Sequence, residues 1–172
     1  LHRAIMLSST YQMSSNWNER YAESDPENKL LWRMNRRRLD AEEIRDSLLA
    51  VGDNLDRRTG GSLLPTKNRA YVTSTANIDI SVYDRPRRSL YVPVVRSALY
   101  SVFQVFDFVE SSVPSGQRKV TNIASQALFI MNSKIVNDQS RALARMLLAT
   151  GTEDAQPRIQ RLYLQVLGRT AG

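Results

Sequence analysis

The chain of 172 residues contains no cysteine and a single histidine, His2. Without cysteine it can form no disulfide, no cysteine-ligated zinc site, no iron–sulfur cluster and no covalently attached c-type haem. A histidine-rich metal site or a Ser–His–Asp triad would depend on His2 alone. We therefore expect neither a metal site nor a cofactor in this chain.

Long hydrophobic runs are missing as well. No segment approaches the ~20 apolar residues that a transmembrane helix needs. Glycine-rich phosphate loops, nucleophile elbows and metal-binding helix motifs are also absent. The length and the hydrophobic fraction of 42% suit a single globular domain over residues 1–172. Because Leu1 falls within a helical pattern, we expect this domain to be a fragment of a larger multidomain protein.

The chain carries an excess of positive charge, with 24 Lys and Arg against 17 Asp and Glu. Residues 1–60 hold 10 basic and 10 acidic side chains, so the net charge of +7 comes from the last two thirds. The densest basic run is followed at once by acidic residues, whereas a phosphate-binding stripe usually lacks such neutralisation. Nucleic acid is therefore an unlikely partner.

The clearest helix signals surround residue 40. Asp40 and Glu43 have the spacing of a capping box. Apolar residues then recur along one helical stripe from Ile44 to Leu55. We expect a helix that begins after Asp40 and ends at Gly52 in a left-handed cap.

Further helices are expected towards both ends of the chain. A short helix fits residues 1–9, and Asp25 before Pro26 indicates a helix start that would turn Leu30 and Leu31 towards the core. The last third is expected to form three amphipathic helices, over residues 121–131, 133–151 and 157–168.

The middle third follows another pattern. Apolar and polar residues alternate with a period of two over residues 78–83, and residues 88–96 are rich in β-formers although Pro93 restricts them to an edge. The sequence therefore predicts a mainly α fold, namely a helical domain with a small antiparallel β element at roughly residues 70–96.

The most unusual local composition is the segment RRRLDAEEIRD, from Arg36 to Asp46. Its arginines could hold an anion bidentately, or they could pair with the neighbouring acids and tie helix ends together. Glu42 and Asp46 would share a helix face, which also permits paired carboxylates for acid–base chemistry. The candidate anion or polar cluster comprises Arg36, Arg37, Arg38, Asp40, Glu43, Arg45 and Asp46.

Three more residues are candidate buried polar groups. Asp107 lies between two phenylalanines and could be a buried carboxylate or a cap. Gln126 and Asn132 flank an apolar helical stretch, where buried amides usually satisfy backbone groups. No residue is identified as catalytic.

Four aromatic residues near the N-terminus leave two alternatives open. They could stack on sugars, or they could be core and rim residues. They are Tyr11, Trp17, Tyr21 and Trp32.

Several segments together resemble one family through nearly all of the chain. These segments are LHRAIMLSSTYQMSS, DPENKLLWRMNRRRLDAEEIRDSLLAVGDNLD, RRSLYVPVVRS, VTNIASQALFIMNS and RLYLQVLGR. In this order they resemble the PSD-type C-terminal domain family of unknown function found beside planctomycete-type cytochrome c domains. The combination of RRRLDAEEIRD with QALFIMN is the most specific part of the resemblance.

The resemblance implies a large exported bacterial protein whose haem domain, where present, lies upstream of this chain. It implies an extracytoplasmic location, in the periplasm or at the cell surface, and it supplies no catalytic residues. Its motif positions are carried over only as positions of the fold or of a site: Arg36, Arg37, Arg38, Asp40, Glu43, Arg45, Asp46, Gln126 and Asn132.

The leading functional hypothesis is a non-catalytic structural or interaction module whose partners are other domains of the same polypeptide. The first alternative is part of an enzyme that acts on polysaccharide through the Arg/Asp/Glu cluster around residues 36–46. The second alternative is an anion-binding or nucleic-acid-binding module.

Overall fold

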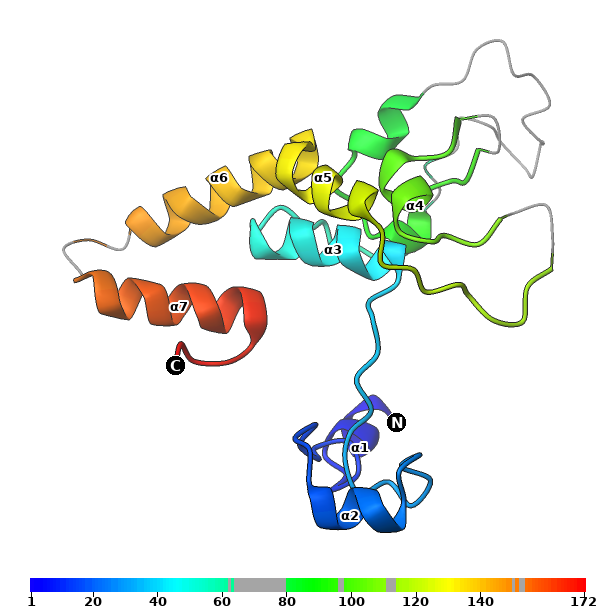
Figure 1. Ribbon diagram of the computed structural model, residues 1–172. Helices are drawn as coiled ribbons and strands as arrows, with labels where there is room; N and C mark the ends of the chain where they lie inside the picture. Colours follow the sequence, from blue (N-terminus) through cyan, green and yellow to red (C-terminus); the bar gives the residue numbers. More distant parts are fainter. Residues whose placement is uncertain (62, 64–79, 96–97, 111–113, 150, 152–153) are drawn as a thin grey trace. The chain divides into compact units, whose positions relative to one another are not determined.

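The computed structural model describes residues 1–61, 63, 80–95, 98–110, 114–149, 151 and 154–172 (Figure 1). Within these ranges the chain forms seven α helices and two 3-10 helices, and no strand is found there. The prediction of a mainly α fold is confirmed. The chain divides into two compact units, unit 1 over Leu1–Arg38 and unit 2 over Leu39–Gly172.

Unit 1 contains two short helices, α1 (His2–Met6) and α2 (Glu19–Ser24). The side chain of Asn18 caps α2 by accepting a hydrogen bond from the backbone N–H of Tyr21 at 3.3 Å. This cap follows from the sequence, since asparagine is among the residues preferred before a helix.

The prediction of a helix that starts at Pro26 is wrong, because the chain forms a turn there. The Asp25 carboxylate accepts hydrogen bonds from the backbone N–H groups of Lys29 and Leu30 at 2.9 and 2.7 Å. These bonds take donors that a continuing helix would use. Leu31 has a φ of 56°, outside the helical range. Leu30 is 83% exposed and Leu31 51%, so neither faces a core.

Unit 2 is organised around α3 (Ala41–Val51), which packs against α4 (Ser101–Val105), α6 (Lys134–Leu148) and the 3-10 helix η2 (Ser89–Tyr91) (Figure 1). The predicted capping box is present: Glu43 Oε2 accepts a hydrogen bond from the Asp40 backbone N–H at 2.9 Å.

The end of α3 differs from the prediction by one residue. Gly52 has a φ of −81°, and the left-handed conformation falls instead on Asp53, with a φ of 55°. Position 52 requires glycine because a side chain would not fit there, and not because of its backbone conformation. A Cβ atom there would lie 2.2 Å from Oε1 of the buried Gln139 on α6.

The three helices predicted for the last third are present, with ends that differ from the prediction by up to three residues. They are α5 (Ala124–Asn132), α6 and α7 (Ala155–Leu167), and Gly168 ends α7 in the left-handed conformation, with a φ of 66°. The core of unit 2 joins α3 to α4, η1 and η2. Its buried apolar members are Ala41, Val82, Tyr83, Val92, Val102, Phe103 and Phe106.

The small antiparallel β element predicted at roughly residues 70–96 is not supported. Part of that range, residues 64–79, lies outside the described residues. In the described part the chain forms 3-10 helices, η1 (Ile80–Asp84) and η2. The isolated bridge that the described residues do form is parallel and pairs Asp56 with Arg87.

Burial and side-chain hydrogen bonding explain why the alternating pattern does not form a strand. Val82 and Tyr83 are neighbours and both are 6% exposed, whereas a strand would send them to opposite faces. The backbone carbonyls of Tyr83, Arg85 and Arg87 also accept their hydrogen bonds from the side chain of Arg45. The Arg45 side chain thus supplies the hydrogen-bond donors that a neighbouring strand would supply in a sheet.

We predict that Gly52→Ala destabilises unit 2. The added Cβ would displace Gln139, whose Oε1 accepts a hydrogen bond from Asn54 Nδ2 at 2.6 Å. The expected loss is about 1 kcal/mol in the free energy of unfolding, measured by urea denaturation. Gly116→Ala is the matched control, because a Cβ there meets no atom within 4 Å. Equal stability of both variants would contradict the prediction.

Candidate functional site

Arg45 is the central polar residue of unit 2. It lies on α3, its side chain is 1% exposed, and its guanidinium donates to the carbonyl oxygens of Arg85, Arg87 and Tyr83 at 2.7, 2.8 and 3.2 Å. It also lies 5.6 Å from the ring centroid of Tyr100. The five donors of a guanidinium suit this role, since each nitrogen can serve more than one acceptor.

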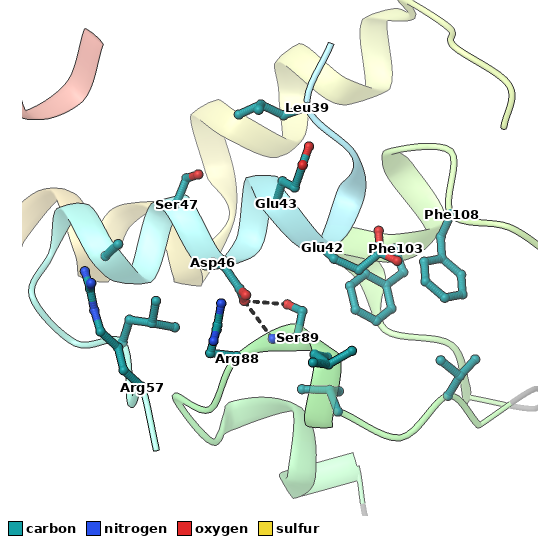
Figure 2. A pocket seen from close by; sticks show the side chains of 15 residues that line it. Leu39, Glu42, Glu43, Asp46, Ser47, Arg57, Arg88, Ser89, Phe103 and Phe108 are labelled. Atoms are coloured by element: carbon teal, nitrogen blue, oxygen red, sulfur yellow. Dashed lines mark hydrogen bonds between the residues drawn. The ribbon is translucent and has the colours of Figure 1, made fainter. Parts of the chain in front are cut away.

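Asp46, the next residue on α3, holds the same segment from the other side. Its Oδ1 accepts hydrogen bonds from the backbone N–H of Ser89 at 2.8 Å and from the Ser89 hydroxyl at 2.7 Å (Figure 2). The same hydroxyl accepts a hydrogen bond from Arg45 Nη1 at 3.3 Å. Arg45, Asp46 and Ser89 therefore form one connected group that fixes η2 against α3.

A cleft of about 790 Å³ lies beside this group. Figure 2 shows its wall on α3, where Glu43, Asp46 and Ser47 follow one another along the helix. Its volume falls in the usual range for ligand sites. The other lining residues are mostly apolar and include Leu39, Leu55, Leu90, Val92, Val94, Phe103 and Phe108.

The carboxylates that line this cleft are already engaged within the protein. Glu43 serves the capping box and Asp46 holds Ser89. Glu42 accepts two hydrogen bonds from Arg118, at 2.6 and 2.8 Å. Burial by itself would raise the pKa of Glu42, but hydrogen bonding and charge attraction from Arg118 outweigh it, so the net pKa is lowered from 4.5. A general acid needs a raised pKa, so Glu42 is not suited to that role.

Two arginines complete the cleft. Arg57 and Arg88 lie across from α3 in Figure 2. Acidic groups on one wall and basic groups on the other make the cleft polar at its edges and apolar within. This arrangement can hold a segment of mixed character, but the structure does not present two free carboxylates to a substrate.

The predicted cluster of residues 36–46 is divided between the two units. Arg36, Arg37 and Arg38 belong to unit 1, and Arg36 Nε donates to Ser15 Oγ at 3.4 Å. The other members, Asp40, Glu43, Arg45 and Asp46, belong to unit 2. In unit 2, Asp46 lies 3.5 Å from its neighbour Arg45, as the pairing alternative predicted, whereas Asp40 and Glu42 both meet the distant Arg118.

Asp107 and Gln126 belong to a second polar network, around Thr121. Asp107 is half-buried and has a φ of 57°. Its carboxylate accepts hydrogen bonds from the backbone N–H and the hydroxyl of Thr121 at 2.8 and 2.9 Å. Gln126 is buried, as predicted, and donates to the carbonyl of Val105 at 3.1 Å and to Thr121 at 3.3 Å. This network ties α5 to the end of α4.

Asn132 is exposed, so the prediction that it is a buried polar residue is wrong. It is the last residue of α5, and its side chain donates to the carbonyl of Leu128, one turn earlier, at 3.0 Å. The asparagine supports the helix end locally and does not reach the Thr121 network.

Sequence reasoning missed Ser89, Arg118 and Thr121, which complete the two networks. Arg118 is 76 residues from Glu42 in the sequence. Ser89 is 43 residues from Asp46. No local sequence signal indicates which residues pair across such separations in the chain. Thr121 was expected only as the first residue of a helix, but it precedes α5 and donates hydrogen bonds to Asp107.

The described ranges contain neither a membrane-spanning helix nor a metal-binding group of side chains. None of the helices there is both long enough and apolar enough to cross a membrane. No group of three or more histidine, cysteine or carboxylate side chains within the same ranges is placed to hold a metal ion.

Fold and site together define a class: an α-helical domain whose irregular segments are held by buried polar side chains. The whole chain, residues 1–172, matches the model of the PSD1 family, described as a protein of unknown function (DUF1553), and the chain belongs to that family. The comparisons with curated proteins and with solved structures gave no match.

We predict that Arg45→Met strongly destabilises unit 2. Methionine fills much of the same space but leaves one buried and two partly buried carbonyls without their donor, and it removes the buried charge next to Asp46. The expected loss in the free energy of unfolding is about 3 kcal/mol or more. Arg141→Met, at an exposed position of α6, should change it by less than about 0.5 kcal/mol in the same urea titration. A stable Arg45→Met protein would refute the central role of Arg45.

We also predict an acid-sensitive contribution from Glu42. Because its pKa in the folded state is below 4.5, its contribution to stability is fully present above pH 4.5 and is lost as the pH falls through the lowered value. Glu42→Gln should therefore lower stability by about 0.5–1 kcal/mol at neutral pH and less at acid pH. Chemical denaturation at several pH values measures this difference. Asp53→Asn, an exposed control, should leave the pH profile unchanged.

Proposed function

We propose that this chain is a non-catalytic interaction module of a large exported bacterial protein, and that it docks onto other domains of the same polypeptide. The observation that carries the proposal is the lack of a core in unit 1. Among its 38 residues only Ala22 and Asn28 are buried. Side chains that would normally form a core are exposed instead: Leu1, Ile5, Met6, Leu7, Leu30 and Leu31.

A unit of this size needs additional support to fold stably. Chains below about 40 residues usually depend on disulfides, metals or association with another surface. Unit 1 contains no cysteine. Association with another surface is supported by the exposed aliphatic side chains, which are the groups that it would bury.

Unit 2 also exposes apolar side chains on its last helices. Leu128 and Met131 on α5 are 58% and 72% exposed. Helix α7 has no buried residue, although Leu164 and Leu167 lie on it. Apolar surface of this extent is typical of proteins that contact a partner.

The non-catalytic part of the proposal is supported by how the candidate residues are used. Arg45, Asp46, Glu43, Asp107 and Gln126 all bind other parts of the chain. A residue that satisfies buried backbone groups is not available for acid–base chemistry. The extracytoplasmic location and the neighbouring planctomycete-type cytochrome c domain rest on the family resemblance alone.

Hydrogen exchange compares this chain alone with the same chain inside the longer polypeptide. We expect the backbone amides of α1 and of residues 28–34 to exchange at least about tenfold more slowly in the longer polypeptide, because docking suppresses local opening. Ile5→Asp together with Leu30→Asp should remove that protection. Asn16→Asp, an exposed polar position of the same unit, should retain it. Identical exchange with and without the other domains would overturn the proposal.

A further inference from the structure

Three aromatic side chains of unit 1 come together around one arginine. The rings of Trp17 and Trp32 meet edge to face, 5.7 Å apart and inclined by 71°, and the ring of Tyr21 lies 6.0 Å from Trp32. The guanidinium carbon of Arg33 lies 5.2 Å from the ring centroid of Trp17 and 5.1 Å from that of Trp32. Tyr11, the fourth aromatic residue considered from the sequence, makes no ring contact with them among the described residues.

These rings remain accessible from outside. Trp17 is 64% exposed and Tyr21 is 53% exposed. Large aromatic side chains normally hide most of their surface in a folded protein. Two exposed rings that each contact Trp32 therefore form a site at which a ligand can remove apolar surface from water.

The guanidinium of Arg33 has no acidic partner among the residues that the structure describes. Within the part of the chain that the structure describes, its side chain forms no ion pair or hydrogen bond, and its buried Nε lacks an acceptor. The nearest candidate acid in sequence, Asp25, directs its carboxylate to backbone N–H groups of Lys29 and Leu30. Arg33 thus offers an uncompensated positive charge between two indole rings.

The loop that carries this group is rigidly built. The buried Asn28 binds the backbone of Arg33 twice, donating to its carbonyl at 2.7 Å and accepting from its N–H at 3.2 Å. The indole N–H of Trp32 donates to the carbonyl of Asp25 at 2.9 Å. Trp32 and Arg33 are therefore held in place before any ligand arrives, which lowers the entropic cost of binding.

We propose that Trp17, Tyr21, Trp32 and Arg33 form a binding site for an acidic sugar, with a uronate residue of a polysaccharide as the ligand. The apolar CH face of a pyranose ring would stack on an exposed aromatic ring. The sugar carboxylate would accept hydrogen bonds from the Arg33 guanidinium, whose planar fork matches a carboxylate. The ligand would supply an acidic partner for the Arg33 guanidinium, which has none among the described residues.

Charge favours this ligand over other occupants. Unit 1 holds seven basic and four acidic side chains. A cationic ligand would compete with Arg33 for the same aromatic faces, so it is disfavoured. A protein surface remains the other class of occupant, because tryptophan, tyrosine and arginine are also common in protein interfaces. The test separates these two classes.

Tryptophan fluorescence reports on this site alone, because Trp17 and Trp32 are the two tryptophans of the chain. The 172-residue chain is titrated with an oligogalacturonate, and separately with the same oligosaccharide after methyl esterification. The first should change the emission in a saturable manner. The ester keeps the sugar ring but removes the charge. The chain should therefore bind the ester at least about tenfold more weakly than the acid, as expected for the loss of a charged hydrogen bond.

Variants divide the site into its two parts. Trp17→Ala should weaken oligogalacturonate binding about tenfold by removing the stacking surface. Arg33→Ala should weaken it by at least as much and should abolish the preference for the acid over its ester. Isothermal calorimetry measures both without relying on fluorescence. Arg3→Ala, on α1, removes the same charge elsewhere in unit 1 and should bind as the unaltered chain does.

Three outcomes would overturn the proposal. The first is an absence of binding at millimolar oligogalacturonate. The second is equal weakening by Arg3→Ala and Arg33→Ala, which would indicate attraction by net charge only. The third is slow hydrogen exchange around Trp17 and Trp32 in the longer polypeptide that added oligogalacturonate does not alter, which would show that a protein domain covers the site.

Discussion

The buried guanidinium of Arg45 is the interaction on which unit 2 depends. The segment from Tyr83 to Ser89 forms no strand and only short 3-10 turns, so its carbonyl groups lack the partners that a sheet would supply. Arg45 supplies them from α3, and Asp46 takes the N–H of Ser89 from the same helix. The cost of burying an unpaired carbonyl is what makes this arginine necessary.

Polar side chains bind backbone groups in other irregular segments of the molecule as well. Asn28 and Asp25 hold the loop of unit 1 through its backbone, and Asp107 with Gln126 holds the connection between α4 and α5. Each of these side chains replaces a missing piece of regular structure. This use of polar residues explains why a cluster of charged and amide side chains in this chain need not indicate catalysis. We assign binding to Arg33 and to the aromatic rings beside it, of which Trp17 and Tyr21 are exposed.

Local sequence signals predicted the helices well. The capping box at Asp40 and Glu43, the start of α6 after Ser133 and the left-handed end of α7 at Gly168 all depend on residues close together in the chain. The prediction failed where side-chain hydrogen bonds in the folded chain outweighed a local sequence signal. Period-two alternation at residues 80–83 indicated a strand, but Arg45 took the carbonyls of the following residues. Asp25 indicated a helix start, but its carboxylate closed a turn.

The sequence by itself determined the mainly helical fold, the capped start of α3 and several of the polar residues that matter, among them Arg45, Asp46 and Gln126. Only the tertiary structure decided what those residues do. The partners of Arg45, Glu42 and Asp46 lie some 40 to 76 residues away, and no spacing rule links side chains across such distances. The position of Arg33 between two indole rings likewise follows from the turn at Asn28, a conformation fixed by hydrogen bonds that form only when the loop closes.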